Sequence, residues 1–153
     1  MKNNLINLNK KFCLVTGSNG HIGKVICEKL LKLGATVIHT DIKKNKIKSK
    51  NSFFFKADLT SKKEIDTLVK QINKKFKRID IMVNNASYVA ATDKDKKNQK
   101  LIYNEQYTRL NLDNTIYLTQ SLISNLEKSR DASIINICSI YSFLAYDYNL
   151  YKG

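Results

Sequence analysis

The sequence predicts an α/β protein built on a doubly wound parallel sheet. Short apolar runs typical of strands alternate with longer segments whose apolar residues recur at helical spacing. A glycine-rich turn lies between the first apolar run and the helical segment that follows it. The length of 153 residues, with no repeat and no Pro/Gly/Ser-rich linker, fits a single domain over residues 1–153.

The first half of the chain is predicted to contain three strands, at 12–16, 36–41 and 53–56. The first strand is nearly continuous in apolar residues, as expected where both faces of a parallel sheet are buried. The helix after the glycine turn is expected to end at Gly34, and residues 43–50 form a polar connection. The apolar face expected for this helix consists of Ile22, Val25, Ile26, Leu30 and Leu33.

The second half is predicted to contain two helices and two strands, which makes five strands in all. The residues 61–64 have the form of a capping box that opens a helix. The apolar stripe of that helix is Ile65, Leu68, Val69, Ile72 and Phe76. The remaining elements are a strand at 79–83, a charged loop at 93–100, a helix from about 105 to about 128, a strand at 133–137 and a loop at 138–153.

The composition argues against several classes of protein. No apolar run approaches the roughly 18 residues of a membrane span, and the polar first 14 residues lack the apolar stretch of a signal peptide. Three cysteines without CxxC spacing indicate neither a disulfide framework nor a zinc site. We therefore expect a cytoplasmic protein in a reducing compartment, with no metal and no membrane partner.

The net charge of +14 raises nucleic-acid binding as an alternative function. However, only three of the 27 basic residues are arginines, the side chain most used to read guanine. A chain rich in Lys and free of Pro also arises when the coding DNA is rich in A and T. We therefore expect no nucleic-acid partner, and steep salt dependence of DNA binding would contradict that expectation.

The strongest functional signal is the segment TGSNGHIG at residues 16–23. Glycines permit a tight turn and a close approach to a pyrophosphate, which the first N–H groups of the next helix then face. The candidate cofactor-binding residues here are Gly17, Ser18, Asn19, Gly20, His21, Ile22 and Gly23. Asp41, at the end of the second strand, can accept hydrogen bonds from ribose hydroxyls and repels a 2′-phosphate, which favours NAD over NADP. Lys43 and Lys44 beside it could instead bind that phosphate.

Four further motifs make the chain resemble the short-chain dehydrogenase/reductase (SDR) family. Ala57-Asp58-Leu59-Thr60 follows the third strand, and Asn84-Asn85-Ala86 after the fourth strand resembles the family motif NNAG. Asn111 falls in the long helix where the family keeps an active-site asparagine, and Ser139 matches its catalytic serine. From the residues alone, Asn111 is expected to share an inward helical face with Tyr107, Leu118 and Leu122.

The resemblance implies a Rossmann fold and an NAD(P)-dependent oxidoreductase acting on a small alcohol or carbonyl compound. It implies that Asp58, Leu59, Asn85 and Ala86 also bind the cofactor and that Asn111 and Ser139 are catalytic. The full-length protein would then be a homo-oligomer. The final segment at 139–153 resembles members found in flagellin and surface-glycan modification, which implies a sugar-related substrate.

Two features depart from the standard family pattern. The spacing TGxxGxxG is favoured by the extended, sugar-nucleotide-acting members, and His21 stands where standard members have their second glycine. Family chemistry also needs a YxxxK motif on a helix. Tyr148 and Lys152 have the spacing of this motif, but the chain ends one residue later, so no helix can hold the pair. We therefore expect the sequence to stop before the catalytic helix and the last strands, leaving the edge of the fifth strand uncovered.

Three functions stay open at this point. The first is the NAD-dependent oxidoreductase, represented by its N-terminal part. The second is a nucleotide-binding module that lacks the proton donor, and the third is an extended-type sugar-nucleotide epimerase or dehydratase.

Overall fold

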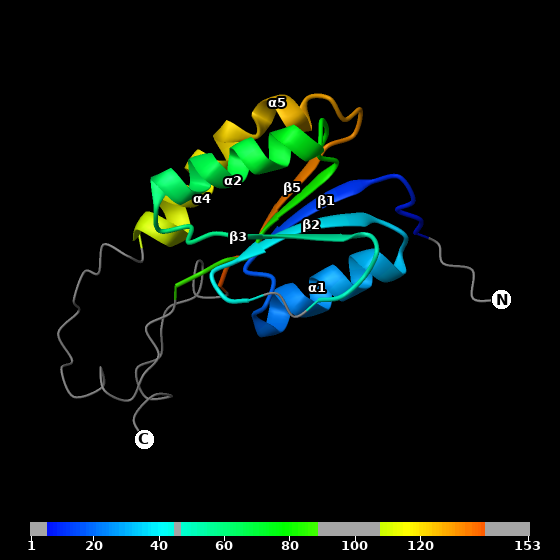
Figure 1. Cartoon of the computed structure of the whole chain (residues 1–153), viewed down its shortest axis with the longest axis horizontal. Helices are drawn as coiled ribbons and strands as arrows, with labels where there is room; N and C mark the ends of the chain where they lie inside the picture. Colours follow the sequence, from blue (N-terminus) through cyan, green and yellow to red (C-terminus); the bar gives the residue numbers. More distant parts are fainter. Residues whose placement is uncertain (1–5, 45–46, 89–107, 140–153) are drawn as a thin grey trace, which may run out of the picture.

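The computed structural model describes residues 6–44, 47–88 and 108–139. Its centre is a parallel sheet of five strands in the order β3-β2-β1-β4-β5 (Figure 1). In chain order the strands are β1 (Phe12–Thr16), β2 (Thr36–Asp41), β3 (Ser52–Lys56), β4 (Ile81–Asn84) and β5 (Ser133–Asn136). The predicted doubly wound sheet is confirmed, and the predicted strand limits differ from these by two residues at most.

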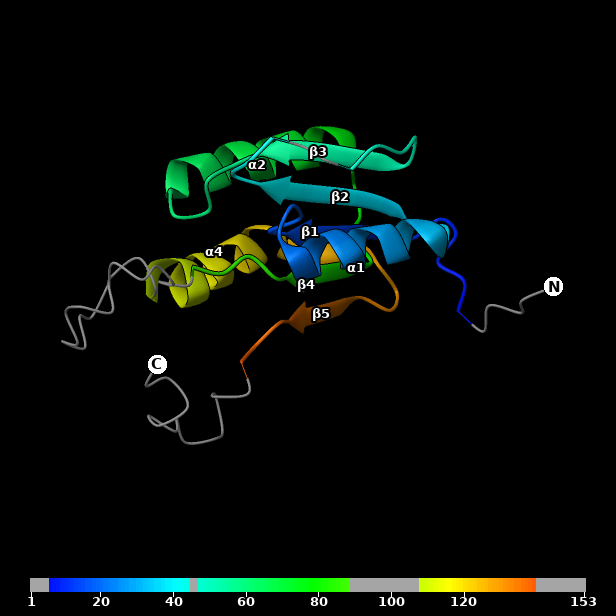
Figure 2. The same cartoon turned by 90° about the horizontal axis from the view of Figure 1, so that it is seen from below.

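Helices cover both faces of the sheet. Helix α1 (His21–Lys32) lies on one face, and α2 (Lys62–Lys75), α4 (Asn114–Ser121) and α5 (Ile123–Leu126) lie on the other (Figures 1 and 2). Alternate residues of the strands serve the two faces, so that Cys13 and Val15 pack toward α1 whereas Leu14 packs toward α2 and α4. The sheet therefore separates two apolar cores.

The inward face of α1 differs in part from the one expected, since Ile26 and Leu30 pack against the core as predicted but Ile22 and Val25 do not. Ile22 is 57% and Val25 64% exposed, whereas Gly23 and Cys27 are buried. A Cβ at Gly23 would overlap the carbonyl oxygen of Gly17, so only a glycine at this position lets the helix approach the turn so closely. The inward face of this helix therefore includes the small residues Gly23 and Cys27 beside Ile26 and Leu30.

The capping box before α2 is present in an altered form. The Ser61 hydroxyl accepts a hydrogen bond from the Glu64 N–H at 3.4 Å, as predicted. The Glu64 carboxylate, however, accepts from the N–H of Asp58 at 2.7 Å instead of from Ser61. The expected apolar stripe is confirmed, since Ile65, Leu68 and Ile72 are fully or almost fully buried.

The helix predicted from about 105 to about 128 is present in the described residues as a helical segment over 108–126, but not as one regular α-helix. The structure has a π-helical turn at Arg109–Asp113, then α4, a break at Leu122 and the short α5. The wide turn shifts the helical phase, so Asn111 is exposed while Leu118 and Leu122 are buried. Residues 105–107 with Tyr107, the predicted loop at 93–100 and residues 140–153 lie outside the described part of the chain.

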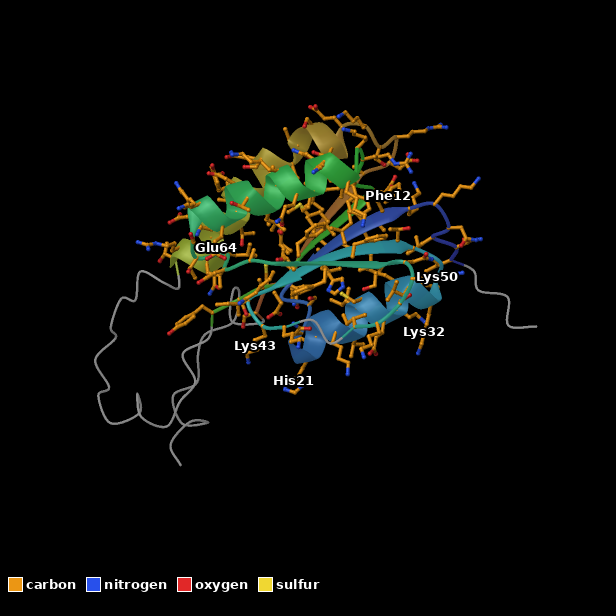
Figure 3. All side chains as sticks on the ribbon, viewed as in Figure 1. Phe12, His21, Lys32, Lys43, Lys50 and Glu64 are labelled. Atoms are coloured by element: carbon orange, nitrogen blue, oxygen red, sulfur yellow. The ribbon has the colours of Figure 1, made fainter. Side chains whose placement is uncertain are left out.

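The lysines that give the chain its charge are distributed around the molecule. Lys24, Lys29 and Lys32 on α1 are exposed on one side of the sheet, and the lysines of α2 are exposed on the other. Lys32, Lys43 and Lys50 lie at the outside of the molecule in Figure 3. None of the helices in the described part is long and apolar enough to cross a membrane.

Strand β5 is the outermost strand on its side of the described sheet. Its residues are exposed, with Ile134 and Ile135 at 44% and 45%. These two side chains point to opposite faces of the sheet because consecutive strand residues alternate. The fifth strand is therefore an open apolar edge in the described structure, as the sequence led us to expect.

Candidate functional site

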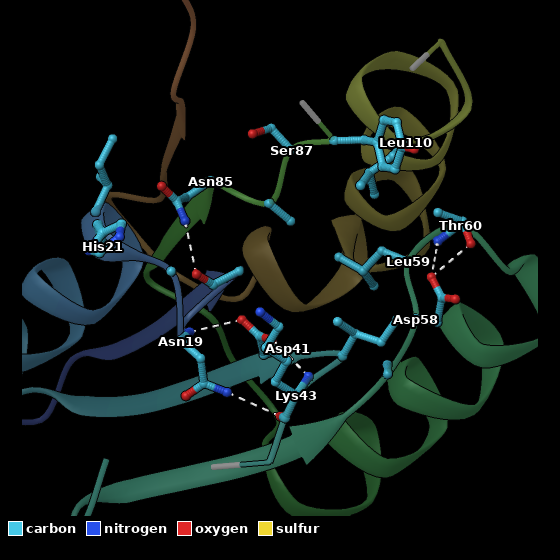
Figure 4. A pocket seen from close by; sticks show the side chains of 17 residues that line it. Asn19, His21, Asp41, Lys43, Asp58, Leu59, Thr60, Asn85, Ser87 and Leu110 are labelled. Carbon is cyan, nitrogen blue, oxygen red and sulfur yellow. Dashed lines mark hydrogen bonds between the residues drawn. The ribbon is translucent and has the colours of Figure 1, made fainter. Parts of the chain in front are cut away.

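A cavity of about 620 Å³ opens where the carboxyl ends of the strands meet (Figure 4). Four of its walls are the segments that follow β1, β2, β3 and β4, and Leu110 of the π-helical turn completes the lining. Parallel α/β sheets bind ligands at this edge. The lining includes ten residues predicted to bind the cofactor: Gly17, Asn19, Gly20, His21, Ile22, Asp41, Asp58, Leu59, Asn85 and Ala86.

The three glycines of the turn have different structural requirements. Gly17 has φ of +65°, and a Cβ there would lie 2.8 Å from the Cα of Ala86. Gly23 also has no room for a side chain. Gly20, in contrast, has φ of −68°, and a Cβ there would meet only the Gly17 carbonyl oxygen, at 3.4 Å. Packing therefore requires glycine at 17 and 23. At position 20 the fold has room for a larger side chain, so the glycine there leaves open space beside the start of α1.

The start of α1 fits the binding of an anion. Gly20 is the N-cap residue and has no side chain to cap the helix, whose first turn contains no acidic residue. The first N–H groups of a helix lack partners within the helix and carry partial positive charge. A pyrophosphate at this end of the cavity would meet these groups without displacing a protein side chain.

Residues after β4 brace the glycine turn. The Asn85 amide Nδ2 donates to the carbonyl oxygens of Thr16 at 3.0 Å and Gly17 at 3.1 Å. The Thr16 hydroxyl accepts from the backbone N–H groups of Asn85 at 3.0 Å and Ala86 at 2.9 Å. The Asn-Asn-Ala motif thus holds the backbone of the turn from the neighbouring strand.

Asp41 is half-buried beside the same turn. Its Oδ2 accepts from the Asn19 N–H and its Oδ1 from the Lys43 N–H, both at 2.8 Å (Figure 4). Two backbone donors fix the direction of the carboxylate, and the residue lines the cavity. Lys43 also lines the cavity, so the two side chains with opposite preferences for a 2′-phosphate lie together there.

Asp58 and Leu59 form another wall of the cavity. The Asp58 Oδ1 accepts from the Thr60 N–H at 2.8 Å and from the Thr60 hydroxyl at 2.7 Å. Its own N–H is held by Glu64 at the start of α2. The carboxylate of Asp58, which the family resemblance assigns to cofactor binding, is therefore fixed locally by Thr60.

Two of the predicted binding residues, Ser18 and Gly23, do not line the cavity but are buried beneath the glycine turn and support it. Gly23 is buried against the turn, and Ser18 is fully buried, with its hydroxyl 2.9 Å from Nδ1 of His39. The other ring nitrogen of His39, Nε2, lies 2.8 Å from the hydroxyl of Ser52.

His39 is a supporting residue that the sequence analysis missed. Burial lowers the pKa of its imidazole to about 4, although the nearby Asp41 acts in the opposite direction. The neutral ring therefore links the glycine turn to β3. The signal for it in the sequence was a histidine inside an otherwise buried strand, which by itself indicates only a core residue.

The two predicted catalytic residues lie outside the cavity lining. The Asn111 side chain is hydrogen-bonded to the backbone of Tyr88, a residue that does line the cavity. Ser139 is exposed and follows β5, whose end lies beside that of β4. Tyr148 and Lys152 lie outside the described residues. The structure thus brings the predicted cofactor residues together but does not unite the predicted catalytic ones.

The described residues contain no group of three or more His, Cys, Asp or Glu side chains that could hold a metal ion. The polar groups around the cavity are instead backbone N–H groups, the carboxylates of Asp41 and Asp58, and the side-chain amides of Asn19 and Asn85. This set fits the phosphate and ribose groups of a dinucleotide.

Comparison with known proteins identifies the family. A model of the short chain dehydrogenase family matches residues 11–150. The 3-oxoacyl-(acyl-carrier-protein) reductase FabG of Aquifex aeolicus is 34% identical over 148 residues, which cover 90% of this chain and 59% of that protein. The (S)-acetoin-forming diacetyl reductase of Staphylococcus epidermidis is 30% identical over 147 residues, which cover 90% of this chain and 56% of that protein.

A solved structure shows the same fold. A short chain dehydrogenase from Leptospira borgpetersenii with bound NAD+ matches with a TM-score of 0.78 at 27% identity, covering 95% of this chain and 57% of that one. The chain therefore spans little more than half the length of these relatives. The finer resemblance to members that modify flagellin or surface glycans stays a prediction. Because the family model matches residues 11–150 and the solved structure has the same fold, the chain belongs to the short-chain dehydrogenase family.

Proposed function

We propose that the protein is an NAD-dependent oxidoreductase that transfers hydride between nicotinamide and a small alcohol or carbonyl compound. The observation that carries the proposal is the cavity itself, in which an uncapped helix start, two fixed carboxylates and the Asn85 brace surround about 620 Å³ of space. The relatives named as reductases and the relative with bound NAD+ support the same chemistry. The proposed substrate is a small molecule, and a sugar derivative is the more specific candidate.

NAD is preferred over NADP in this proposal because of Asp41. A carboxylate oriented by two N–H donors can accept hydrogen bonds from ribose hydroxyls and repels a 2′-phosphate. The pyrophosphate would lie at the start of α1 near Gly20 and Ile22. Asp58 and Leu59 would hold the adenine end, and Asn85 and Ala86 would line the path toward the nicotinamide.

The bound nicotinamide would supply or accept the hydride. The Ser139 hydroxyl would donate a hydrogen bond to the substrate oxygen as negative charge develops there. Asn111 would act as a positioning residue, because its amide holds the backbone of Tyr88 at the cavity wall. Proton transfer needs a further acid or base, and Tyr148 and Lys152 have the YxxxK spacing of the family's residues for this role.

A nucleotide-binding module without turnover is the second candidate. The position of Ser139 outside the cavity lining favours it, since the cofactor residues come together without the serine. The two candidates make the same prediction for NADH binding and different predictions for turnover.

Two measurements test the proposal on the purified chain. Titration with NADH, followed by nicotinamide fluorescence and calorimetry, should give saturable binding at one site that is weakened about tenfold by Asp41→Ala. Failure of the chain to bind either NADH or NADPH would contradict both candidates. NADH oxidation with diacetyl or another carbonyl compound, abolished by Ser139→Ala with NADH binding retained, would favour the enzyme over the module.

A further inference from the structure

Asn19 closes a ring of hydrogen bonds between two turns that are far apart in the sequence. Its backbone N–H donates to Oδ2 of Asp41, and Oδ1 of Asp41 accepts from the N–H of Lys43, both at 2.8 Å. The side-chain Nδ2 of Asn19 then donates to the carbonyl oxygen of Lys43 at 3.1 Å. The same Nδ2 donates to the carbonyl oxygen of Lys44, also at 3.1 Å. Figure 4 shows the part of the ring formed by Asn19, Asp41 and Lys43 beside the cavity.

The ring controls which side chains a ribose would meet. Asp41 and Lys43 both line the cavity, whereas Lys44 is exposed at its margin and does not line it. The Asn19 amide donates to the backbone carbonyl oxygens of both lysines, so it ties the main chain that carries them to the glycine turn. The Asp41 carboxylate keeps its position in the cavity wall because the ring supplies both of its N–H donors, from Asn19 and Lys43.

We propose that Asn19 is a specificity-determining positioning residue, whose amide holds the turn after β2 so that Asp41 and not the lysines meets the 2′ position of the adenosine ribose. The proposal rests on the dinucleotide function proposed above and adds a residue that selects between its two forms. It also resolves the conflict between Asp41 and its lysine neighbours. With the ring intact the carboxylate is fixed toward the ribose, and with the ring open the main chain at 43–44 can shift and bring the ammonium groups closer to a 2′-phosphate.

The test compares four forms of the full chain: wild type, Asn19→Ala, Asn19→Ala with Lys43→Ala and Lys44→Ala, and Asn51→Ala. The last is the matched control, since it makes the same chemical change in the turn before β3, away from the cavity lining. Dissociation constants for NADH and for NADPH are measured by calorimetry. Hydrogen–deuterium exchange of the amides at 41–44 is measured without cofactor, and circular dichroism checks that each variant is folded.

The expected result is a change in the ratio of the two constants. Loss of hydrogen bonds of ordinary strength should raise the NADH constant roughly fivefold to tenfold in Asn19→Ala. The NADPH constant should fall, because the ammonium groups come closer to the 2′-phosphate, so that the preference for NADH drops about tenfold or more. The triple variant should lose the gained NADPH binding, exchange at 41–44 should be faster in Asn19→Ala, and Asn51→Ala should match the wild type.

Several outcomes would overturn the proposal. If Asn19→Ala weakens NADH and NADPH by the same factor, the residue has only a structural role. If neither constant changes, or if exchange at 41–44 is unaffected, the amide does not hold the turn. Wild-type binding of neither dinucleotide would instead overturn the proposed function on which the inference rests.

Discussion

The side-chain amide of Asn111 holds the backbone of Tyr88 at both of its polar groups. Its Oδ1 accepts from the Tyr88 N–H at 2.8 Å, and its Nδ2 donates to the Tyr88 carbonyl oxygen at 3.1 Å. Asn111 belongs to the π-helical turn, and Tyr88 ends the described segment that follows β4. This pair joins the helical layer to one wall of the cavity.

Replacement of Asn111 should therefore affect both stability and binding. Asn111→Ala removes both hydrogen bonds, which should lower the free energy of unfolding by about 1–2 kcal/mol and weaken NADH binding several-fold. Asn111→Asp keeps the acceptor but loses the donor, so its effect should be intermediate. Urea unfolding and NADH titration measure the two effects, and an Asn111→Ala variant indistinguishable from wild type would refute the role assigned to the pair.

The two glycines at the start of α1 should respond differently to alanine. Gly23→Ala places a methyl group into the Gly17 carbonyl, so it should destabilise the fold by ~1–3 kcal/mol. Gly20→Ala has room in the fold but adds a methyl group beside the cavity, so it should keep nearly the wild-type Tm and weaken NADH binding. Thermal melts with and without NADH separate the two effects. Equal loss of stability in both variants would contradict the assignment of Gly20 to ligand approach.

His39 should make folding stability depend on pH. Its folded-state pKa of about 4 lies below the ordinary value, so its contribution is complete above about pH 6.5 and is lost as the pH falls from 6.5 toward 4. The loss can reach about 3 kcal/mol across this range, since each unit of pKa shift corresponds to 1.36 kcal/mol.

The matched variant for this prediction is His39→Gln, which can still hydrogen-bond to the hydroxyls of Ser18 and Ser52 but does not titrate. Urea unfolding at pH 7, 6 and 5 should show a steeper decline in the wild type than in the variant. Parallel declines in the two proteins would show that other groups cause the pH dependence.

The three cysteines should differ strongly in reactivity. Burial raises the pKa of the Cys13 and Cys27 thiols to about 12, whereas Cys138 is exposed after β5. At pH 8 only about one in ten thousand molecules then carries a thiolate at either buried site. Titration with Ellman's reagent should modify one thiol in the native protein and three in guanidinium chloride. Rapid reaction of two or more thiols without denaturant would contradict the burial of this pair.

The strands and the glycine turn could be predicted because their signals are local. The β1 run, the Thr16–Gly23 turn and the position of Asp41 each depend on a short stretch of sequence, and the structure has them as expected. The apolar stripe of α2 was equally readable, because its large residues all face the core.

The errors arose where one segment depends on another. Sequence periodicity favoured Ile22 and Val25 for the inward face of α1, but Gly23 is buried there against the Gly17 carbonyl and the side chain of the distant Asn85. The π-helical turn changes the phase of the later helix, which a constant period of 3.6 residues does not allow. The Asn19 and Asn111 contacts likewise join segments 22 to 25 residues apart, so no local pattern could reveal them.

The Asn85 brace has a consequence for the order in which the protein folds. It joins β4 to a turn 69 residues earlier in the chain, whereas Asp41 and the glycine turn are separated by only about a third of that distance. Closure of the longer loop costs more chain entropy, so an early intermediate of β1, β2 and β3 would hold the acidic residue beside an unbraced turn. The cavity would become complete only when β4 docks. A bound dinucleotide should therefore slow unfolding and leave the rate of refolding almost unchanged.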